Sequence, residues 1–560
     1  MEKRYFLALL LAAVVVAITQ IVFPVSRQPV NNVATTGGNK AVVATSDKLQ
    51  QLIISRQDSV RTSRQLQQES GQPPSADSGK AFGPAEMTTV TTSHSLYRFS
   101  SLGAVPVSID LKEYKSLAPL GGVVELGTPG QPLLRYAVVI GGDTINLGHS
   151  LFHVRQTGEA GKNGQLLYDA TVKGLHVAIV YEFAPESYVV RVKGRIEGAG
   201  KGSFLLIQLP VSLKPAESDT VADLRNLAYS FKPGRENARI VPFAKLDPGE
   251  EKLEPGPLTW AAVKNKYFVF GLLNPEGSSF SEITLKGGAR TSKLATNASA
   301  TIVKALENDS FAMDLYAGPQ QSTQLISLGR DFDHVNPYGW RFLQGVVQPI
   351  AALCIRLLLW MHGVFRLSYG WVLIIFGVLI RVALWPLNQS AMRSSMKMQE
   401  IQPKLAEVQK KYKDKPEKQR EEIMKVYRDA GASPFTALTG CLPALIPMPV
   451  LFALFFVFQN TIEFRGVSFV WLHDISVRDP FFILPVLMGI SMYALSWIGL
   501  RNAPPNPQAK MMSYMFPVMM TFVLANMASG LNLYYTAQNI AALPQQWLLA
   551  KERARRSQAK

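Results

Sequence analysis

Hydrophobic residues along this 560-residue chain gather into long runs near its two ends, while short apolar and polar stretches alternate in the middle. The first run begins after Glu2, Lys3 and Arg4 and continues to Phe23. With its flanks it approaches the roughly 20 residues that cross a bilayer, and no clear A-x-A cleavage site follows it. We therefore predict that residues 1–23 form an uncleaved transmembrane signal anchor with a cytoplasmic N-terminus; a cleaved signal peptide is the alternative.

The next two regions differ sharply in pattern. Residues 24–81 contain no aromatic side chain and are rich in Ser, Thr, Gln, Asn and Gly, which predicts a flexible tether. From about Phe82 onward, short β-rich runs such as PLLRYAVVI, LHVAIVYEF and SFAMDLYAG are separated by clusters of Gly, Pro, Asn and Asp. Repeated short strands without intervening helical runs favour an antiparallel sandwich. We expect residues 82–332 to form an all-β domain that is large enough to bury its own core.

After Asp333 the long apolar runs return. Four polar side chains and a proline interrupt residues 339–366, which favours an interfacial amphipathic helix over a membrane span. The interrupting residues are Arg341, Gln348, Pro349, Arg356 and His362. Five spans are predicted beyond this helix, at about residues 369–387, 440–460, 481–500, 511–526 and 531–549. Together with the anchor they make an α-helical polytopic membrane protein of six transmembrane helices, with a five-helix core in residues 367–549.

The net charge of +17 is distributed in a way that predicts the topology. Eleven Lys or Arg residues lie between Arg393 and Arg428, and the tail at residues 550–560 adds five more, whereas residues 461–480 contain two. Because cytoplasmic loops carry the excess of basic residues, we place the 393–428 segment and the C-terminus in the cytoplasm and the β-rich domain on the other side. Basic residues beside membrane spans set the orientation of the chain and attract anionic lipid, which explains the positive charge. No sequence-specific nucleic-acid partner is therefore expected. The two cysteines, Cys354 and Cys441, provide no disulfide framework.

A helical hairpin is predicted at residues 392–430, between the second and third spans. Five apolar side chains spaced by three and four residues form one seam, and Pro416 suits the first turn of a second helix that closes it. The seam residues are Met398, Ile401, Leu405, Val408 and Tyr412, and their partners are Ile423, Tyr427 and Ala430. The pattern fits a stable hairpin with a solvated basic face. It fits equally an arm that recruits a ribosome, a targeting factor or a nascent chain.

One arginine lies inside an otherwise apolar span, in the segment GVLIRVALWPL. Placing Arg381 in the bilayer costs about 2.5 to 3.5 kcal/mol on insertion scales, so such a charge usually faces a partner or a watery cavity. It lies about six residues, or roughly 9 Å, from the cytoplasmic end of its span. Snorkelling to the interface is therefore the alternative interpretation.

Polar side chains recur on the sixth span. Asn532, Tyr535 and Asn539 are spaced at i, i+3 and i+7 on one helix face, with Gln538 beside them. Such a face can join helices by hydrogen bonds, or it can line a wet cavity together with Arg381. Methionines, including Met515 and Met519, are dense near the cytoplasmic side; they suit either an adaptable apolar surface or ordinary contact with lipid.

The search for catalytic chemistry gives little. His149 and His153 lie four residues apart in GHSLFHV, which is interpreted as a strand that would place both on one face. A Cys or acidic cluster is missing from their surroundings in the sequence, so a metal site is not favoured. The sequence contains no Gly-rich phosphate loop, GxSxG or HExxH motif. We expect no enzyme, catalytic residue, metal or cofactor.

Several local motifs together resemble the YidC/Oxa/Alb family of membrane insertases. They are LIRVALWPLN, IQPKLAEVQKKY, GCLPALIPMPVLFALF, WLHDIS followed by DPFFILPVLMG, and SGLNLYYTAQN, within residues 339–549. DLYAGP is similar to the periplasmic β-supersandwich of the Gram-negative branch. Two features depart from the family pattern. The entry to the third span, ASPFTALTGC, is longer than usual, and Gly377 stands where some members carry a polar residue.

The resemblance implies a bacterial inner-membrane insertase and chaperone. A positively charged hydrophilic groove in the inner leaflet would be formed by Arg381, Asn532, Tyr535, Gln538 and Asn539. An apolar substrate slide would be formed by Phe452, Phe455, Met515 and Met519. The implied partners are nascent membrane proteins, the Sec translocon, ribosomes and targeting factors at the hairpin and basic tail, and membrane lipids, with insertion proceeding with or without Sec.

Two other classes of function stay open from the residues. A solute transporter often shows inverted repeats, and this chain shows none. The β domain is similar in architecture to sugar-mutarotase sandwiches and could act on carbohydrate, an idea that rests on fold analogy alone.

Overall fold

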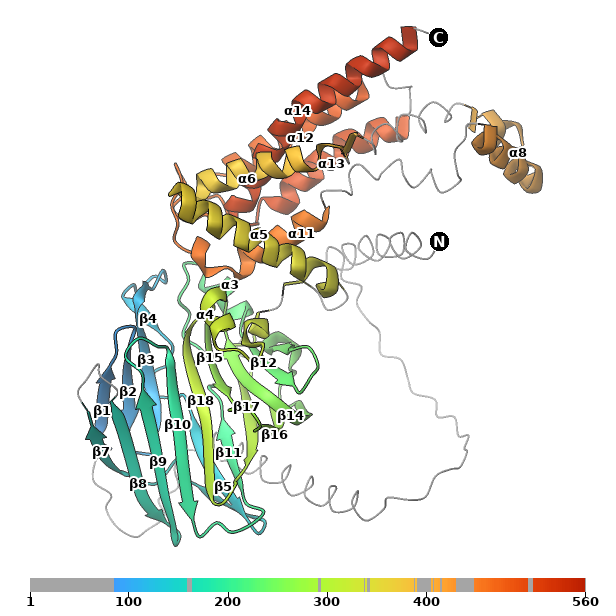
Figure 1. The fold of residues 1–560 in the computed structure, drawn as a ribbon. Coiled ribbons are helices and arrows are strands. Elements are labelled where there is room, and N and C mark those ends of the chain that lie inside the picture. The colour runs from blue at the N-terminus through green and yellow to red at the C-terminus, as the bar shows by residue number, and fades with distance from the viewer. Residues whose placement is uncertain are drawn as a thin grey trace, which may run out of the picture. The chain divides into compact units, whose positions relative to one another are not determined.

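A computed structural model describes residues 85–158, 164–290, 294–336, 338–339, 343–386, 388–389, 404–405, 407–412, 415–429, 448–501 and 507–558. The predicted anchor at residues 1–23 and the tether at residues 24–81 lie outside this described part. The remainder contains a β domain followed by a helical region (Figure 1).

The β domain consists of antiparallel strands in two sheets. Its strands are β1 (Met87–Thr91), β2 (Ser95–Ser100), β3 (Val105–Lys115), β4 (Val123–Glu125), β5 (Arg135–Ile140), β6 (Asp143–Asn146), β7 (His153–Thr157), β8 (Gln165–Val172), β9 (Leu175–Phe183), β10 (Val189–Glu197), β11 (Phe204–Gln208), β12 (Ala228–Pro233), β13 (Arg239–Pro242), β14 (Glu251–Lys264), β15 (Phe268–Leu273), β16 (Phe280–Gly287), β17 (Ala298–Ala305) and β18 (Ser310–Pro319). The smaller sheet has the order β1-β2-β3-β4. The larger sheet has 14 strands with the main path β6-β5-β11-β17-β16-β14-β15-β18-β10-β9-β8-β7, and β12 and β13 lie off this path. The predicted large β domain is therefore confirmed.

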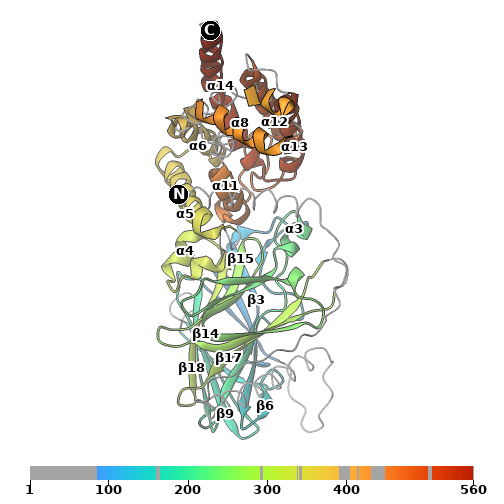
Figure 2. The ribbon, with the colours of Figure 1, turned by 90° about the vertical axis from the view of Figure 1, so that its right-hand side faces the viewer.

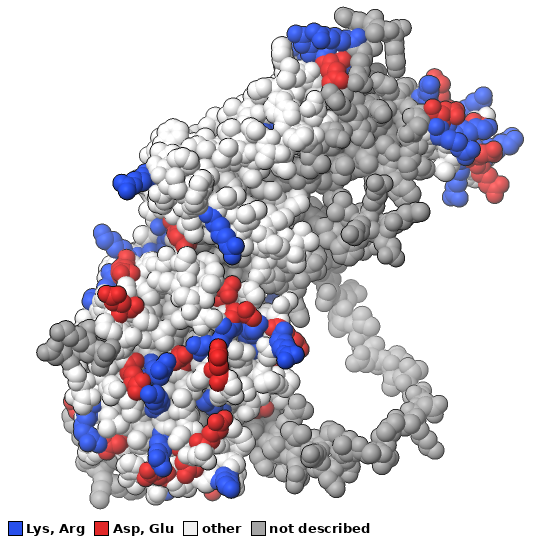
Figure 3. Space-filling view, viewed as in Figure 1, with Lys and Arg blue, Asp and Glu red and all other residues white. Residues whose placement is uncertain are grey.

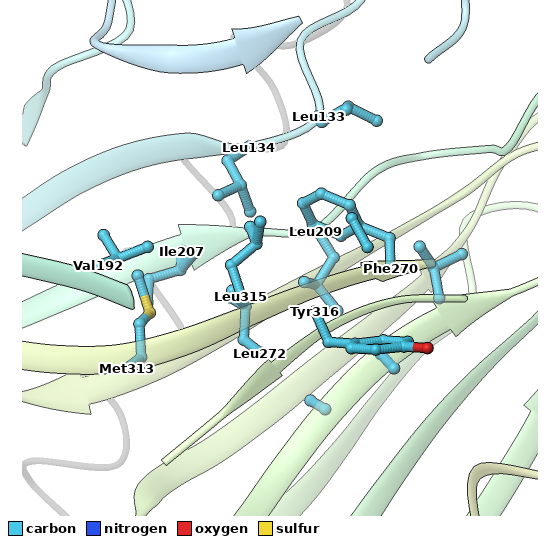
Figure 4. Close-up of a cluster of buried hydrophobic side chains, with 14 of the residues drawn as sticks. Leu133, Leu134, Val192, Ile207, Leu209, Phe270, Leu272, Met313, Leu315 and Tyr316 are labelled. Carbon is cyan, nitrogen blue, oxygen red and sulfur yellow. The ribbon is translucent and has the colours of Figure 1, made fainter. Parts of the chain in front are cut away.

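Alternation along the strands explains how these sheets bury a core. In β10, Val190, Val192 and Ile196 are buried, while Arg191 and Lys193 between them are exposed. Successive side chains of a strand point to opposite faces, so a one-residue shift of register would expose the whole apolar set. Side chains from several strands meet in the core, as Figure 4 shows. The short helices α3 (Thr220–Arg225) and α4 (Ser322–Ser327) lie at one end of the strands (Figures 1 and 2).

Gly194 makes room for an aromatic ring within this core. It is the cross-strand partner of Phe311, which is only 5% exposed. A β-carbon on Gly194 would overlap the ring of Phe311. We expect Gly194→Ala to lower the free energy of unfolding of the β domain by about 1–3 kcal/mol, the usual cost of overpacking. Faster hydrogen exchange in β10 and β18 would report this loss. The double variant Gly194→Ala/Phe311→Leu should recover part of it, and an unchanged single variant would contradict the packing explanation.

The helical region begins after Leu343. Its helices are α5 (Gln344–Phe365), α6 (Tyr369–Ala383), α8 (Pro416–Asp429), α11 (Met448–Asn460), α12 (Ile483–Leu500), α13 (Pro507–Leu524) and α14 (Ser529–Gln558). Where described, these helices coincide with the five predicted spans to within a few residues, except that α14 continues through most of the basic tail. Residues 440–447 of the predicted third span lie outside the described part.

Length and composition identify membrane-spanning candidates among the described helices. Gly345–Phe365 and Ile483–Leu500 are long and apolar enough to cross a bilayer, while Tyr369–Ala383, Pro449–Asn460 and Ser513–Leu524 are shorter apolar helices. The first of these two candidates lies within residues 339–366, for which the sequence predicts an interfacial helix. On the face that Figure 3 shows, the visible surface over the helices is nearly uncharged, whereas charged side chains are spread over the β domain and gather on α8 and at the end of α14.

A loop of the helical region contacts the β domain through a buried ion pair. Arg465, in the connection between α11 and α12, donates from Nε to Oε1 of Glu217 at 2.7 Å, and both side chains are 6% exposed. The same guanidinium donates to the Ala216 carbonyl at 3.0 Å and lies 5.4 Å from the centre of the Phe268 ring. Ile462 of this loop belongs to the β-domain core. Burial raises the pKa of the Glu217 carboxyl, although Arg465 opposes the shift.

Candidate functional site

Arg381 is anchored by a glutamine from the last helix. Its guanidinium donates to Oε1 of Gln545 at 2.9 Å, and Nε2 of Gln545 donates to the Trp385 carbonyl at 3.1 Å. Gln545 is 1% exposed. Its two hydrogen bonds join α14 to the side chain of Arg381 on α6 and to the backbone just after that helix. The site thus consists of a cation near the end of α6, held in place by a buried amide from α14.

The charge of Arg381 is not neutralised by any described residue. No carboxylate in the described ranges forms an ion pair with it, and its buried Nε has no hydrogen-bond partner there. A buried donor without an acceptor costs about 1–3 kcal/mol, and more when it is charged. A negative or strongly dipolar group entering the site would therefore be favourable, because it would satisfy a donor for which the described residues provide no acceptor.

Gly377 lets helices α6 and α14 approach closely beside Arg381. A β-carbon at this position would lie 3.0 Å from the Tyr534 carbonyl oxygen and 3.4 Å from Cβ of Ala537. Small residues at such crossings permit close backbone approach between membrane helices. Tyr534 also packs against Phe376 of α6, with 5.9 Å between the ring centres. The departure from the family pattern at position 377 thus has a packing explanation in this chain.

The predicted polar face of α14 is divided among different neighbours. Asn532 donates to the Leu524 carbonyl at the end of α13 at 3.0 Å, and Asn539 donates to Oγ of Ser491 on α12 at 3.0 Å. These two bonds join neighbouring helices, which is one of the two roles that the sequence allowed for this polar face. Gln538 is buried, and Tyr535 is half-buried with its ring against Tyr534. The structure gives none of these four residues a hydrogen bond to Arg381.

The partner that the structure supplies, Gln545, was not singled out in the sequence. A signal for it exists, because Gln545 lies seven residues after Gln538 and so falls on nearly the same side of the helix. Gln545 was missed because Pro544 and Gln546 flank it, and a proline with two glutamines is typical of the end of a membrane span. The polar side of α14 therefore extends one heptad further toward the C-terminus than the i, i+3, i+7 pattern indicated.

Apolar side chains are exposed on α13 and half-exposed on α11. On α13, Met515 is 51% exposed, Met519 is 44% exposed and Phe522 is 74% exposed. On α11, Phe452 and Phe455 are half-buried. Exposure of this kind is required by both interpretations of the methionines, contact with lipid and contact with a variable apolar partner.

The predicted hairpin is described in part. Met398, Ile401 and Ala430 lie outside the described residues. Pro416 begins α8, as its position in the sequence predicted. Tyr427 is buried against Leu405, Ile423 and Val426, while Val408 and Tyr412 are half-buried. A hydrogen bond from Nε2 of Gln419 to the Gln409 carbonyl, at 3.0 Å, also joins the two arms.

The placement predicted for the two histidines is wrong. His153 begins β7, but His149 lies in the turn before it, because the Asn146 side chain accepts a hydrogen bond from Gly148 N at 2.9 Å and ends the preceding strand. The two histidines therefore do not share a strand face. Within the described ranges, no group of three or more His, Cys, Asp and Glu side chains could hold a metal ion.

Comparisons with known proteins give consistent matches. The family model described as "60Kd inner membrane protein" matches residues 360–556, and the one described as "YidC periplasmic domain" matches residues 87–353. The protein named membrane protein insertase YidC in Pelodictyon phaeoclathratiforme is 36% identical over 409 residues, which are 67% of this chain and 66% of the relative. Its counterpart in Chlorobaculum tepidum is 33% identical over 397 residues, 66% of this chain and 65% of the relative. The matched region thus spans about two thirds of these relatives.

Solved structures give weaker likenesses. A crystal structure of an active YidC insertase with its first transmembrane domain resolved has a TM-score of 0.33 and 18% identity, covering 83% of this chain and 95% of that one. The crystal structure of YidC from Thermotoga maritima has a TM-score of 0.28 and 13% identity, covering 83% and 99%. At these scores the structural likeness adds nothing to the sequence matches.

Proposed function

Because the chain belongs to the YidC family of membrane protein insertases, we propose that it inserts integral membrane proteins into the bacterial inner membrane from the cytoplasmic side and assists their folding. In this proposal both termini and the 392–430 hairpin are cytoplasmic, and the β domain is periplasmic. The basic residues of α8 and of the end of α14 support that orientation. The protein acts by transient binding rather than by catalysis of a covalent step.

The observation that carries the proposal is the free hydrogen-bonding capacity of Arg381. Gln545 occupies part of the guanidinium and fixes its position, while Nε and the positive charge are left without a described partner. A polar or acidic segment of an incoming chain can bind there for a short time, because the contact replaces part of the hydration that the segment loses. Asn532, Tyr535, Gln538 and Asn539 are the proposed polar wall beside it.

The apolar segment of the substrate supplies the driving force. We propose that it moves along Phe452 and Phe455 of α11 and Met515 and Met519 of α13. On insertion scales each Leu, Ile, Phe or Val at the centre of a helix contributes about −0.3 to −0.6 kcal/mol, so a strongly apolar span of roughly 20 residues gains several kcal/mol. Such a gain exceeds a single hydrogen bond to Arg381, so no nucleotide is needed and the arginine controls the rate rather than the equilibrium.

Substrate capture is assigned to the hairpin, with the basic tail as a second contact for ribosomes and targeting factors. The seam around Tyr427 is internal to the hairpin, so the hairpin can be removed without exposing a core elsewhere. Deleting residues 392–430 and joining the ends with a short flexible linker should slow insertion of ribosome-delivered substrates severalfold while the rest stays folded. Insertion of purified substrates added with the Sec translocon, compared with insertion without it, measures both routes. Normal rates for every substrate would contradict the role of the hairpin.

Site-specific photocrosslinking to a stalled nascent chain tests the proposed function directly. A photoreactive residue at Met515 should crosslink to the apolar segment of a membrane-protein substrate, and one at Tyr535 should crosslink to its polar segment. The matched control is position 360, because Trp360 lies on α5 and is 57% exposed, comparable with the 51% of Met515. Equal crosslinking at positions 515 and 360 would show general contact with lipid-embedded chain rather than a defined route.

A further inference from the structure

The hairpin that joins β3 to β4 ends in an exposed apolar turn. Lys115 and Val123 are cross-strand partners beside this turn. The N–H of Gly121 closes it by donating to the Ala118 carbonyl at 2.9 Å. Leu120 lies within the turn and is 92% exposed, which makes it the most exposed large apolar side chain among the described residues.

The local conformation keeps Leu120 in solvent. Pro119 precedes it and fixes φ near the value that the second position of a four-residue turn requires. Gly121 and Gly122 follow it with φ of +63° and +86°, a region that glycine adopts without strain. The turn therefore presents Leu120 outward. Single exposed apolar side chains are ordinary on protein surfaces, so Leu120 alone would indicate nothing.

This hairpin is fastened to the loop between α11 and α12. The Ala216 carbonyl accepts a hydrogen bond from the N–H of Leu117, at 2.8 Å, and another from the guanidinium of Arg465, at 3.0 Å. A β-carbon on Gly466 would lie 4.0 Å from Cδ1 of Leu117, which is an ordinary van der Waals distance. The exposed turn of the β domain thus belongs to a hairpin that contacts a loop of the helical region.

That loop contains a second exposed apolar turn. Phe469 and Leu472 exchange two backbone hydrogen bonds, of 2.9 and 2.8 Å, so Val470 and Trp471 form a two-residue turn between them. Val470 is 77% exposed and has φ of +52°, which is a strained conformation for a β-branched residue. An outlier of this kind, with its apolar side chain in solvent, points to a functional contact.

The turn at Val470 is anchored at the start of α6. The ring of Phe469 occupies the space that a β-carbon on Gly370 would need. Trp371 follows in α6 and is 52% exposed, and its ring centre lies 5.5 Å from that of Phe469. Tryptophan at the end of a membrane helix typically lies at the interface between water and the acyl chains. This level is therefore the one at which Val470 is exposed.

The charges around the two turns are compatible with a bilayer surface. Residues 114–124 and 466–473 contain no Asp or Glu. The exposed charges that border the turns on β3 and α3 are the cations Lys112, Lys115 and Arg225 and the anions Glu113 and Asp219. Their balance is slightly positive, so lipid phosphates would not be repelled, and the apolar side chains carry most of the attraction.

We propose that the β domain rests on the periplasmic leaflet of the bilayer through these two turns, with Leu120 and Val470 entering the boundary between headgroups and acyl chains. Lys115 then lies at the level of the lipid phosphates, with its apolar stem directed toward the turn. An apolar patch can also bind another protein, but the fastening of both turns to a loop between membrane helices favours the bilayer. The proposal rests on the topology of the proposed function, in which the β domain is periplasmic.

An environment-sensitive fluorophore tests the contact in full-length protein reconstituted into vesicles of phosphatidylcholine and phosphatidylglycerol. It is attached at Leu120→Cys, in a parent in which Cys354 and Cys441 are replaced by alanine and whose unchanged hydrogen exchange shows that it is folded. The matched control is Leu253→Cys, because Leu253 is an exposed leucine of β14, at 37%. Lipid with a spin label near its headgroup should quench position 120 about twofold or more and leave position 253 nearly unchanged, since apolar groups at this boundary lie roughly 5–10 Å deep. Iodide in the water should show the opposite order.

A charged substitution tests whether the apolar side chain causes the contact. Val123 is 44% exposed, so a label at Val123→Cys reports from the same hairpin when position 120 is changed. Leu120→Asp should remove most of the lipid quenching at position 123, because a carboxylate does not enter the boundary, whereas Leu253→Asp should leave it unchanged.

Docking is overturned if lipid quenches position 120 no more than position 253, or if Leu120→Asp has no effect. Protection of position 120 from iodide without quenching by lipid would also overturn it, because a second copy of the chain would then cover the turn.

A separate measurement distinguishes failure of the docking from failure of the topology. In spheroplasts, a membrane-impermeant maleimide should react at Leu253→Cys but not at Arg420→Cys on α8, which the proposed function places in the cytoplasm. Reaction at position 420 alone would overturn that topology and with it the choice of leaflet. Reaction at position 253 alone, without lipid quenching at position 120, would overturn the docking and leave the proposed function intact.

Discussion

Replacing Arg381 with alanine should slow insertion of substrates with an acidic translocated tail by roughly ten- to a hundredfold, while strongly apolar substrates with neutral tails insert almost normally. Hydrogen bonds to charged groups contribute about 1.5–3 kcal/mol, and 1.4 kcal/mol corresponds to a factor of ten. The guanidinium can make such bonds because its Nε has no partner among the described residues. Arg381→Lys keeps the charge but loses the planar arrangement of donors, so its effect should be intermediate.

Paired substrates that differ only in tail charge provide the measurement, with all variants present at equal protein level. Arg553→Ala is a matched control, because Arg553 is likewise half-buried, has a buried Nε without a described partner, and uses another guanidinium nitrogen to donate to an oxygen, here the Gly499 carbonyl at the end of α12. This change should not distinguish the two tails. If the Arg381 side chain instead extends to the membrane surface, its charge only orients the helix, and Arg381→Ala should leave the insertion of both substrates unchanged. Equal losses for both tails, or no loss for either, would falsify the electrostatic role of Arg381.

Much of the fold was predictable because the determining signals are local. The apolar runs gave α6 and α12 to within a few residues, and Pro416 marked the start of α8 because its ring suits the first helical turn. The end of α14 was predicted too early because the prediction relied on the same local apolar pattern. The apolar pattern stops near residue 549, but the following residues, including Lys551 and Glu552, favour helix, so the helix continues to Gln558 beyond the predicted span.

The candidate site was less predictable because its contacts are not local. The charge of Arg381 could be found from composition, since an arginine is rare in an apolar run. Its partner Gln545 lies 164 residues away, and no periodicity links positions so distant. Likewise, the spacing of Asn532 and Asn539 showed a shared helix face but not that α13 and α12 would each take one of them. Hydrogen bonding between helices depends on how the helices cross, which a single sequence does not specify.

Arg465→Met should detach the 461–480 loop from the β domain locally, at a cost of about 3–5 kcal/mol at neutral pH, because it leaves Glu217 buried and unpaired. Both members of the pair are 6% exposed, so solvent provides little compensation. Hydrogen exchange should therefore lose protection in α3 and in the loop, while the strands of the β domain keep theirs. The matched control is Arg191→Met, which removes an exposed ion pair. Arg191 is 60% exposed in its pair with Asp314, so this change should lower the free energy of unfolding by about 1 kcal/mol or less.

The loss in Arg465→Met should depend on pH in a defined direction. Burial already raises the pKa of Glu217 in the folded protein, and removing Arg465 takes away a cation that lowers it, so this pKa rises further. A carboxyl group whose pKa is higher when folded binds protons more tightly in the folded state, so stability falls as the pH rises above its unfolded value. The neighbouring Asp223, whose pKa is also raised by burial, acts in the same direction. The deficit should thus be largest at neutral pH and shrink as the solution is acidified toward the ordinary range of carboxyl groups.

A second substitution distinguishes charge from packing in this contact. Arg465→Met/Glu217→Gln replaces the unpaired carboxylate with a neutral amide, so it should recover most of the protection at neutral pH and show little dependence on pH. Protection factors corrected for intrinsic exchange, compared between about pH 5 and pH 8 over residues 216–225 and 461–480, give the measurement. If the double variant is as poorly protected as Arg465→Met, and neither changes with pH, then the contact of the guanidinium with the Phe268 ring, rather than its charge on Glu217, holds the loop in place.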